Sequence, residues 1–186
     1  AAPPERPPVD LLLALPRPKV MRRLWAPLAS LGVGRILLAN AWKVERNYFD
    51  THVLDPDTYR PLLLEGLQQA RDTLLPEVHI HRQFKKLIED ELPAPSPSEL
   101  RLAADASAGA RIHEAVSRSA PGVRALLAVG PEGGWTDYER ELLARHGFIL
   151  AGLGQRILRA DTACVALLAL VHDALNAQRA AFPRPL

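Results

Sequence analysis

The residues from Val129 to Glu139 read VGPEGGWTDYE and lie between an apolar run and a charged, periodic segment. Two adjacent glycines cost backbone entropy, so Gly133 and Gly134 indicate that something is gained from a flexible or closely approachable backbone. Thr136-x-x-Glu139 matches a capping box, which predicts that a helix begins here. The stretch therefore joins a strand to a helix through a glycine-rich loop. This loop is either a tight turn or a surface on which a ligand lies.

The same alternation of apolar runs and amphipathic segments continues outward in both directions. It predicts strands at residues 9–15, 35–39, 78–81, 100–104, 124–129 and 148–153. It predicts helices at residues 19–31, 55–72, 84–92, 110–118, 136–145 and 161–181, with loops at 43–54 and 93–98. Strands that alternate with helices are typical of an α/β domain with a mainly parallel sheet flanked by helices. Ligands of such sheets bind beyond the carboxyl ends of the strands, where residues 103–105, 130–134 and 153–163 are unusual.

The composition is typical of a soluble globular protein. Of the 186 residues, 48% are hydrophobic and 24% are charged, and the formal net charge is +2. No apolar run reaches the roughly 18 residues that span a membrane, and no secretory signal is visible. We therefore expect a cytoplasmic protein without a membrane partner. Residues 1–8 contain four prolines, which predicts a linker or tail before a domain at residues 9–186.

Several familiar kinds of site are excluded. The sequence contains no G-x-x-x-x-G-K-[ST], no G-x-G-x-x-G after the first strand, no His-Glu-x-x-His and no G-x-S-x-G. The single cysteine, Cys164, excludes an internal disulfide and a multi-cysteine zinc site, and its apolar neighbours predict a core thiol. His79 and His81 alternate on a predicted strand and so face one side. Nothing nearby completes a metal site, so we predict no metal and a solvated or RNA-facing role for both histidines.

Two longer motifs resemble those of one protein family. GPEGGWTDYE at residues 130–139 and LGQRILRADTA at residues 153–163 are similar, in sequence and in order, to the motifs of the RsmE-type ribosomal-RNA uridine-N3 methyltransferases of the SPOUT superfamily. Weaker similarity extends the resemblance over most of the chain from about Val9. The sequence departs from the family at Ser30, at residues 70–72 and at Asp161, where the family has Glu, a Gly-Arg pair and Glu.

The resemblance implies a SPOUT-type α/β fold whose C-terminal segment threads a trefoil knot, although general topology rules disfavour knots. It implies S-adenosylmethionine as cofactor, RNA as partner, and a homodimer with its active site near the interface. The apolar residues between Ala163 and Leu175 favour such an interface. The family usually begins with a PUA-like RNA-binding barrel, which is absent from this chain. The cofactor-binding residues that the resemblance implies are Gly130, Pro131, Glu132, Gly133, Gly134, Leu153, Gly154, Arg156, Ile157 and Leu158.

The resemblance also places Arg159 at the methyl-transfer site or against the RNA. Uracil N3 carries a proton that titrates above neutral pH, so its methylation requires removal of the proton and stabilisation of the anion. Arg159 is the candidate that stabilises the anion, and Asp161 is the candidate that accepts the proton. Alternatively, Arg156 and Arg159, which would share a face if their segment were helical, bind RNA phosphate or pair with Asp161. Asp161 could also cap the last helix.

Two clusters of basic residues are either solvated faces or RNA contacts. The first is Arg17, Lys19, Arg22 and Arg23, and the second is Arg82, Lys85 and Lys86.

We expect an S-adenosylmethionine-dependent RNA methyltransferase that acts on uridine N3 in small-subunit ribosomal RNA. One alternative is a non-catalytic RNA- or ribosome-binding module that keeps the knotted fold. Another is a small α/β nucleotide-binding enzyme of a different kind.

Overall fold

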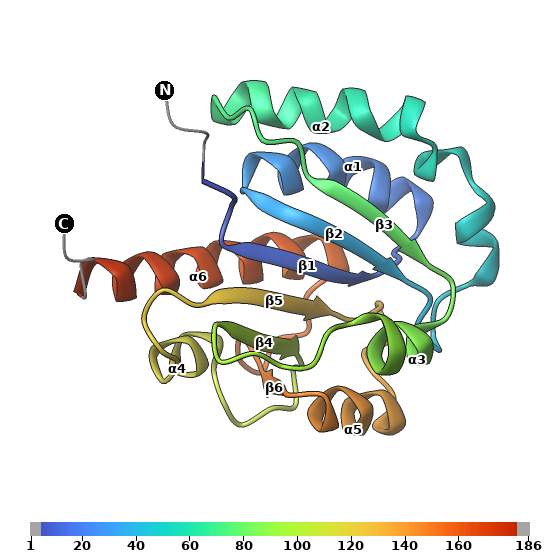
Figure 1. The fold of residues 1–186 in the computed structure, drawn as a ribbon. Helices are drawn as coiled ribbons and strands as arrows, with labels where there is room; N and C mark the ends of the chain where they lie inside the picture. Colours follow the sequence, from blue (N-terminus) through green and yellow to red (C-terminus); the bar gives the residue numbers. More distant parts are fainter. Residues whose placement is uncertain (1–4, 182–186) are drawn as a thin grey trace.

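The computed structural model describes residues 5–181 and contains a six-stranded sheet whose paired strands all run parallel. The strand order is β3-β2-β1-β5-β4-β6 (Figure 1). The strands are β1 (Val9–Ala14), β2 (Val33–Ala39), β3 (Glu77–His81), β4 (Glu99–Ala104), β5 (Arg124–Val129) and β6 (Phe148–Ala151). All six predicted strands are therefore confirmed, with bounds that differ by at most two residues. Their parallel arrangement brings every carboxyl end to one edge of the sheet.

Helices cover both faces of the sheet (Figure 1). On one face, packing contacts place four helices in the spatial order α2, α1, α6, α4. These are α1 (Pro18–Ser30), α2 (Pro56–Ala70), α4 (Ile112–Ser117) and α6 (Ala160–Ala181). α3 (Phe84–Lys86) and α5 (Asp137–Arg145) lie on the other face, near the carboxyl ends of the strands. The predicted α/β architecture is confirmed.

Two segments differ from the sequence-based prediction. The helix expected at residues 84–92 consists of α3 and a π-helical turn, Leu87–Glu91. The expected loop at residues 43–54 contains two 3-10 helices, Arg46–Asp50 and His52–Leu54. A tertiary hydrogen bond stabilises the second of these, because Trp25 Nε1 donates to Val53 O at 3.2 Å. Local periodicity in the sequence does not reveal a partner that far away.

Strand β1 lies at the centre of the core. All of its residues are buried, and Leu11, Leu12 and Leu13 have no exposed surface, as expected for a parallel strand covered on both faces. Asp10 is the polar exception, at 4% exposure. Its carboxylate accepts hydrogen bonds from Arg35 N at 2.8 Å and from Arg35 Nε at 2.9 Å. These bonds compensate for the loss of water around a buried charge.

The segment before β1 contacts the domain. Arg6 lies 3.9 Å from the Asp10 carboxylate and 3.7 Å from that of Glu77, and Pro8 O accepts a hydrogen bond from Ala125 N at 2.8 Å. Residues 1–4 of the predicted linker and residues 182–186 of the predicted domain lie outside the described part of the chain. A boundary between tail and domain at residue 9 stays a prediction.

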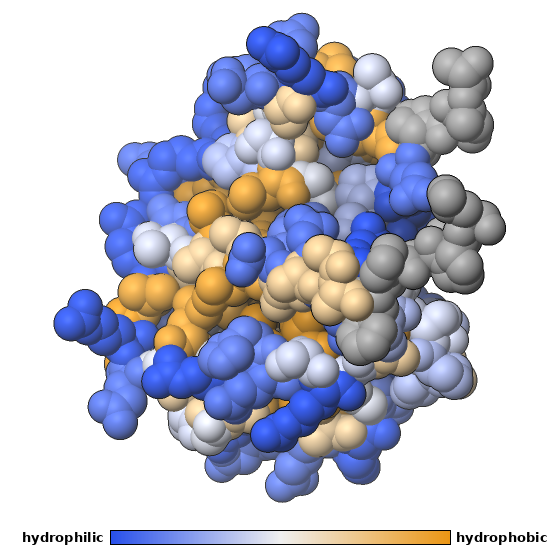
Figure 2. Space-filling view, turned by 90° about the vertical axis from the view of Figure 1, so that its left-hand side faces the viewer, coloured by the Kyte–Doolittle hydropathy of each residue, from blue (hydrophilic) through white to orange (hydrophobic). Residues whose placement is uncertain are grey.

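Helix α6 is apolar on more than its buried side. Leu167, Leu168 and Val171 pack into the core, whereas Val165 and Leu170 are 37% and 43% exposed. Figure 2 shows a band of apolar side chains across the side of the molecule where α6 ends. By length and composition α6 could cross a membrane, but core helices of soluble proteins pass the same test. Its packing against α1, α4 and β5 indicates a helix of this domain.

Candidate functional site

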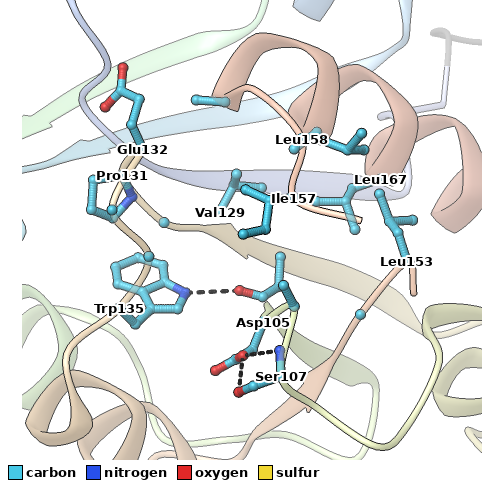
Figure 3. A pocket seen from close by; sticks show the side chains of 18 of the residues that line it. Asp105, Ser107, Val129, Pro131, Glu132, Trp135, Leu153, Ile157, Leu158 and Leu167 are labelled. Carbon is cyan, nitrogen blue, oxygen red and sulfur yellow. Dashed lines mark hydrogen bonds between the residues drawn. The ribbon is translucent and has the colours of Figure 1, made fainter. Parts of the chain in front are cut away.

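A cavity of about 530 Å³ opens where the carboxyl ends of β4, β5 and β6 meet (Figure 3). Three segments that are distant in sequence form its wall: the end of β4, the loop after β5, and the loop after β6 with the start of α6. The lining residues are 104–107, 129–135, 140, 152–154, 156–158, 160, 163 and 167. In open parallel sheets, ligands bind at this edge.

The glycines of the loop after β5 serve different purposes. Gly134 has a φ of +69°, which side-chain-bearing residues rarely adopt, and its N–H donates to Pro131 O at 2.8 Å in a tight turn. No atom lies within 4 Å of the position that a Cβ on Gly134 would take. At Gly130, in contrast, a Cβ would lie 3.1 Å from the Trp135 ring. Gly130 is therefore required by packing and Gly134 by backbone conformation, and Gly134 also leaves free space beside the loop.

The loop after β6 forms the apolar side of the cavity. In Figure 3, Ile157, Leu158 and Leu167 lie on one side of the cavity, and Asp105 with Ser107 lies on the other. Gly152 allows the strand ends to approach, because a Cβ there would lie 2.6 Å from Asp105 O. Ile157 is 88% exposed, so it adds exposed apolar surface to this side of the cavity.

Polar groups gather at the end of β4. Asp105 Oδ1 accepts hydrogen bonds from Ser107 N at 2.7 Å and from Ser107 Oγ at 2.6 Å. Arg140 Nη1, on α5, lies 3.4 Å from the other carboxylate oxygen. Burial alone would favour the neutral acid, but the hydrogen bonds from Ser107 and the charge of Arg140 outweigh it and hold the pKa of Asp105 below its usual value. The cavity thus contains an ionised carboxylate.

Glu139 fixes the start of α5 beside the glycine loop. Its Oε2 accepts hydrogen bonds from Thr136 N at 2.8 Å and Thr136 Oγ1 at 3.0 Å, while Glu139 N donates to Thr136 Oγ1 at 3.2 Å. The predicted capping box is therefore confirmed. Glu139 Oε1 accepts a further hydrogen bond from Trp42 N at 2.7 Å, in the loop after β2. Lys43 Nζ donates to Gly133 O at 2.6 Å, so two bonds join that loop to this region.

The structure brings together the residues predicted to bind the cofactor but not the two predicted to be catalytic. All ten of the former line the cavity, whereas Arg159 and Asp161 do not. α6 begins at Ala160 and the preceding loop is not helical, so the condition under which Arg156 and Arg159 would share a helix face is not met. The alternative that Asp161 caps the helix is also wrong, because Asp161 lies within its first turn.

Asp161 is paired with two arginines. Arg23 of α1 donates to Asp161 Oδ2 at 2.9 Å, and Arg159 Nη2 lies 3.3 Å from the same oxygen. Burial opposes ionisation of this carboxyl group, but the Thr162 N–H and the two arginines hold its pKa below the usual value. The Arg159 side chain is nevertheless 71% exposed. The alternative that Arg159 pairs with Asp161 is confirmed, while Arg156 forms no ion pair with any described residue.

Sequence reasoning did not assign a role to several residues of the cavity. Ser107, Trp135, Arg140 and Gly152 line it, and Asp105 was noted only as the end of an unusual strand. Trp135 is buried, and its Nε1 donates to Ala104 O at 3.1 Å, which joins the glycine loop to β4 (Figure 3). The signal that could have found these residues is the strand order, because β4 lies between β5 and β6.

The two histidines of β3 and the single cysteine lie in different surroundings. His79 and His81 face one side, with ring centroids 6.4 Å apart, and each lies beside a glutamate, Glu77 or Glu91. Among residues 5–181, no group of three or more His, Cys, Asp or Glu side chains could hold a metal ion. Cys164 is fully buried as predicted, and burial raises the pKa of its thiol to about 12.

Comparison with known proteins identifies the family. A model of the RNA methyltransferase domain matches residues 4–172, and the chain belongs to this family. It is 30% identical over 179 residues to ribosomal RNA small subunit methyltransferase E of Treponema pallidum, covering 96% of this chain and 66% of that protein. The corresponding protein of a Synechocystis strain is 30% identical over 173 residues, covering 91% and 54%. The chain therefore spans about half to two thirds of the length of these relatives.

Solved structures share the fold. The ribosomal RNA small subunit methyltransferase E of Neisseria gonorrhoeae, bound to S-adenosyl methionine, aligns with a TM-score of 0.73 at 20% identity, covering 89% of this chain and 65% of that one. A probable rRNA-methyltransferase from Porphyromonas gingivalis aligns with a TM-score of 0.76 at 19% identity, covering 96% and 72%. The predicted fold class is confirmed in its parallel sheet and flanking helices. The trefoil knot stays a prediction.

Proposed function

We propose that the protein is an S-adenosylmethionine-dependent RNA methyltransferase that methylates N3 of a uridine in small-subunit ribosomal RNA. The observation that carries this proposal is the meeting of two sequence motifs, Gly130–Gly134 and residues 153–158, around one cavity at the carboxyl edge of the sheet. Membership of the RNA methyltransferase domain family supports the reaction class. The names of the relatives support the substrate.

The donor set of the cavity fits the proposed cofactor. Its volume of about 530 Å³ lies within the range of pockets that hold small molecules. Apolar side chains on one side suit the faces of an adenine and the methionine chain, while the Asp105 carboxylate can accept hydrogen bonds from hydroxyl or amino groups. The free space beside Gly134 lets backbone groups contact a ligand. When bound, S-adenosylmethionine supplies an electrophilic methyl group.

Arg159 is the proposed anion-stabilising residue. Its guanidinium is largely exposed at the start of α6, one residue before Ala160, which lines the cavity. A cation in that position can stabilise the charge that develops on uridine when N3 loses its proton. Asp161 fits the role of proton acceptor less well, because its lowered pKa makes it a weak base. We therefore propose that Asp161 positions Arg159 through their ion pair.

We further propose that the protein acts as a homodimer in the cytoplasm. The exposed apolar side chains of α6 provide a surface that a second copy can cover. A partner chain near α6 would also lie close to Arg159, which precedes that helix. RNA is the proposed partner of the exposed basic side chains around α1, among them Arg22 and Arg23.

Isothermal titration calorimetry combined with a methyl-transfer assay tests this proposal. We expect micromolar binding of S-adenosylmethionine and transfer of its labelled methyl group to small-subunit ribosomal RNA at a uridine N3. Binding without transfer to any RNA would favour the non-catalytic RNA-binding module. No heat at millimolar cofactor would contradict the cofactor assignment.

A further inference from the structure

A second cavity, of about 600 Å³, borders the same loop as the first. Trp135 lines the first cavity and its neighbour Thr136 lines the second, and no residue is common to both. The second cavity lies between the loop after β2, the start of α3 and the first turn of α5. Its lining residues are 40–42, 44, 46, 84, 85, 136, 138 and 139. Thr136, Tyr138 and Glu139 belong to the motif at residues 130–139, but the proposed methyl transfer gives this cavity no role.

The second cavity has an apolar floor and an aromatic rim. Ala41, Val44 and Phe84 are buried at its base. Trp42 and Tyr138, from two different elements, are 84% and 50% exposed. Large aromatic rings bury much apolar surface when they bind a partner, so a tryptophan left this exposed indicates a contact surface. The packing of the described residues gives no other reason for its exposure.

Hydrogen bonds hold the backbone that carries the two aromatic residues of the rim. Trp42 N donates to Glu139 Oε1 at 2.7 Å, and Val44 N donates to Ala41 O at 3.0 Å in the following turn. Tyr138 directly precedes Glu139 in α5, so one buried carboxylate fixes the backbone beneath both rings. These bonds fix the backbone positions from which the two rings project, so less backbone freedom is lost when a flat ligand stacks on them.

The charges of the lining select the kind of ligand. Arg46 and Lys85 are exposed cations, and Arg46 forms no ion pair with any described residue. Lys85 has only an exposed partner, Glu89, at 3.7 Å. The carboxylate of the lining, Glu139, already accepts hydrogen bonds at both oxygens. Aromatic rings beside one unpaired cation and one held only by an exposed carboxylate match a nucleotide, whose base stacks while its phosphate is neutralised.

We propose that this cavity holds one unstacked base of single-stranded RNA, with Trp42 and Tyr138 as stacking surfaces and Arg46 and Lys85 near the adjacent phosphates. The base would belong to a nucleotide near the one that is methylated, because the two cavities are separated only by the loop around Trp135 and Thr136. The site would thus hold the RNA strand across that loop. The inference takes RNA as the partner from the proposed function but does not depend on catalysis.

Fluorescence anisotropy with a 5′-fluorescein single-stranded RNA of mixed sequence tests this inference. Trp42→Ala should weaken binding by about 5- to 150-fold, the cost of removing one base–aromatic stack. Trp42→Phe should recover most of the affinity because it keeps a ring. Ile149→Ala is the matched control: it removes another exposed apolar side chain, on β6 and outside both cavities, and should leave RNA affinity unchanged. Calorimetry should give the same S-adenosylmethionine affinity for all four proteins.

Four results would overturn the inference. They are no binding of single-stranded RNA by the unaltered chain, unchanged RNA affinity in Trp42→Ala, equal loss in Ile149→Ala, and conversion of a dimer to a monomer by Trp42→Ala. The last result would assign the cavity to a protein interface. If the protein transfers methyl groups and Trp42→Ala leaves RNA affinity unchanged, this inference fails and the proposed function stands. If RNA binding requires Trp42 but no methyl group is transferred, this inference stands and the proposed function fails.

Discussion

Gly134 and Gly122 have nearly the same backbone conformation, with φ values of +69° and +79°. At neither position would a Cβ meet another atom within 4 Å. Only Gly134 lines the proposed cofactor cavity, whereas Gly122 lies in the turn before β5. A side chain introduced at either glycine causes similar backbone strain, because both have positive φ. Only a side chain at Gly134 would also occupy space in the cavity, so comparing the two variants shows whether a ligand contacts this loop.

We expect Gly134→Asn to lose S-adenosylmethionine binding and Gly122→Asn to keep it. Asparagine tolerates positive φ better than valine, so both variants should fold with similar, modest losses of stability. Calorimetry measures the affinity, and thermal unfolding checks that the two losses of stability match. If Gly134→Asn binds with unchanged affinity, the loop is a turn and does not contact the cofactor.

Arg159 and Arg23 provide a second matched pair, because both lie beside the Asp161 carboxylate. Arg159→Ala should reduce methyl transfer by about 100-fold while leaving folding and cofactor affinity nearly unchanged, since one charge-stabilising donor is lost. Arg159→Lys should recover only part of the rate, because an ammonium does not reproduce a planar guanidinium. Arg23→Ala breaks the other ion pair and should leave most of the rate. Equal loss of rate in Arg23→Ala and Arg159→Ala would instead indicate that both arginines only position Asp161.

At the scale of elements, the end of β4 is coupled to α5 through Asp105. The carboxylate is ionised in the folded chain and is held by Ser107 and by Arg140, whose guanidinium also pairs with Asp137. The folded pKa of Asp105 lies below its usual value, so the unfolded chain takes up this proton more readily as the pH falls. The stabilisation from Asp105 is complete above its unfolded pKa and is lost as pH falls through the folded pKa.

We therefore expect acid to destabilise the unaltered chain more steeply than Asp105→Asn. The difference in the free energy of unfolding between the two proteins should shrink as the pH falls through 3.8, the usual pKa of an aspartate, and then through the lower folded pKa. Ser107→Ala removes one hydrogen bond to the carboxylate and should give an intermediate slope. Urea unfolding at a series of pH values measures these slopes. Parallel curves for the unaltered chain and Asp105→Asn would contradict the assigned ion pair and hydrogen bonds.

The elements differ in how far local sequence specified them. Helix α5 begins as predicted because Thr136 and Glu139 satisfy each other's backbone N–H groups within one turn. Residues 84–92 have helical periodicity, yet only α3 and a π-helical turn form there. Phe84 packs against Trp135 with ring centroids 5.3 Å apart. Helical periodicity in the sequence expresses neither this contact with a distant element nor the π-helical turn that follows α3.

At the scale of the whole molecule, α6 presents the apolar side chains Val165 and Leu170 to the outside. We expect light scattering at micromolar concentration to give twice the 20.4 kDa mass of one chain. Leu170→Glu, on the exposed side of α6, should convert this dimer into a monomer because it places a charge in an apolar interface. Ile80→Glu is the control: Ile80 is 42% exposed, close to the 43% of Leu170, but lies on the edge strand β3. A monomer for the unaltered chain, or dissociation by Ile80→Glu as well, would contradict the proposed α6 interface.

The sequence by itself determined which segments are strands and helices, because apolar period and capping residues act within a few neighbouring positions. It also determined the two glycine-containing motifs, and the resemblance that they carry led to ten of the residues that line the cavity. These properties depend on residues that are close together in the sequence. The order of strands within the sheet depends on residues that are far apart in the sequence.

Only the tertiary structure decided what stands beside those motifs. Parallel pairing of β4 with both β5 and β6 places Asp105 against the two glycine loops, and Gly152 is required because backbone there nearly touches backbone. A hydrogen bond across 97 residues, from Trp42 N to Glu139, joins two of the segments that line the second cavity. The ion pair between Asp161 and Arg23 of α1 also joins distant segments, and it adds a second arginine beside the carboxylate that Arg159 contacts. Each of these contacts depends on how distant elements pack, and packing is a property of the whole core rather than of any one segment.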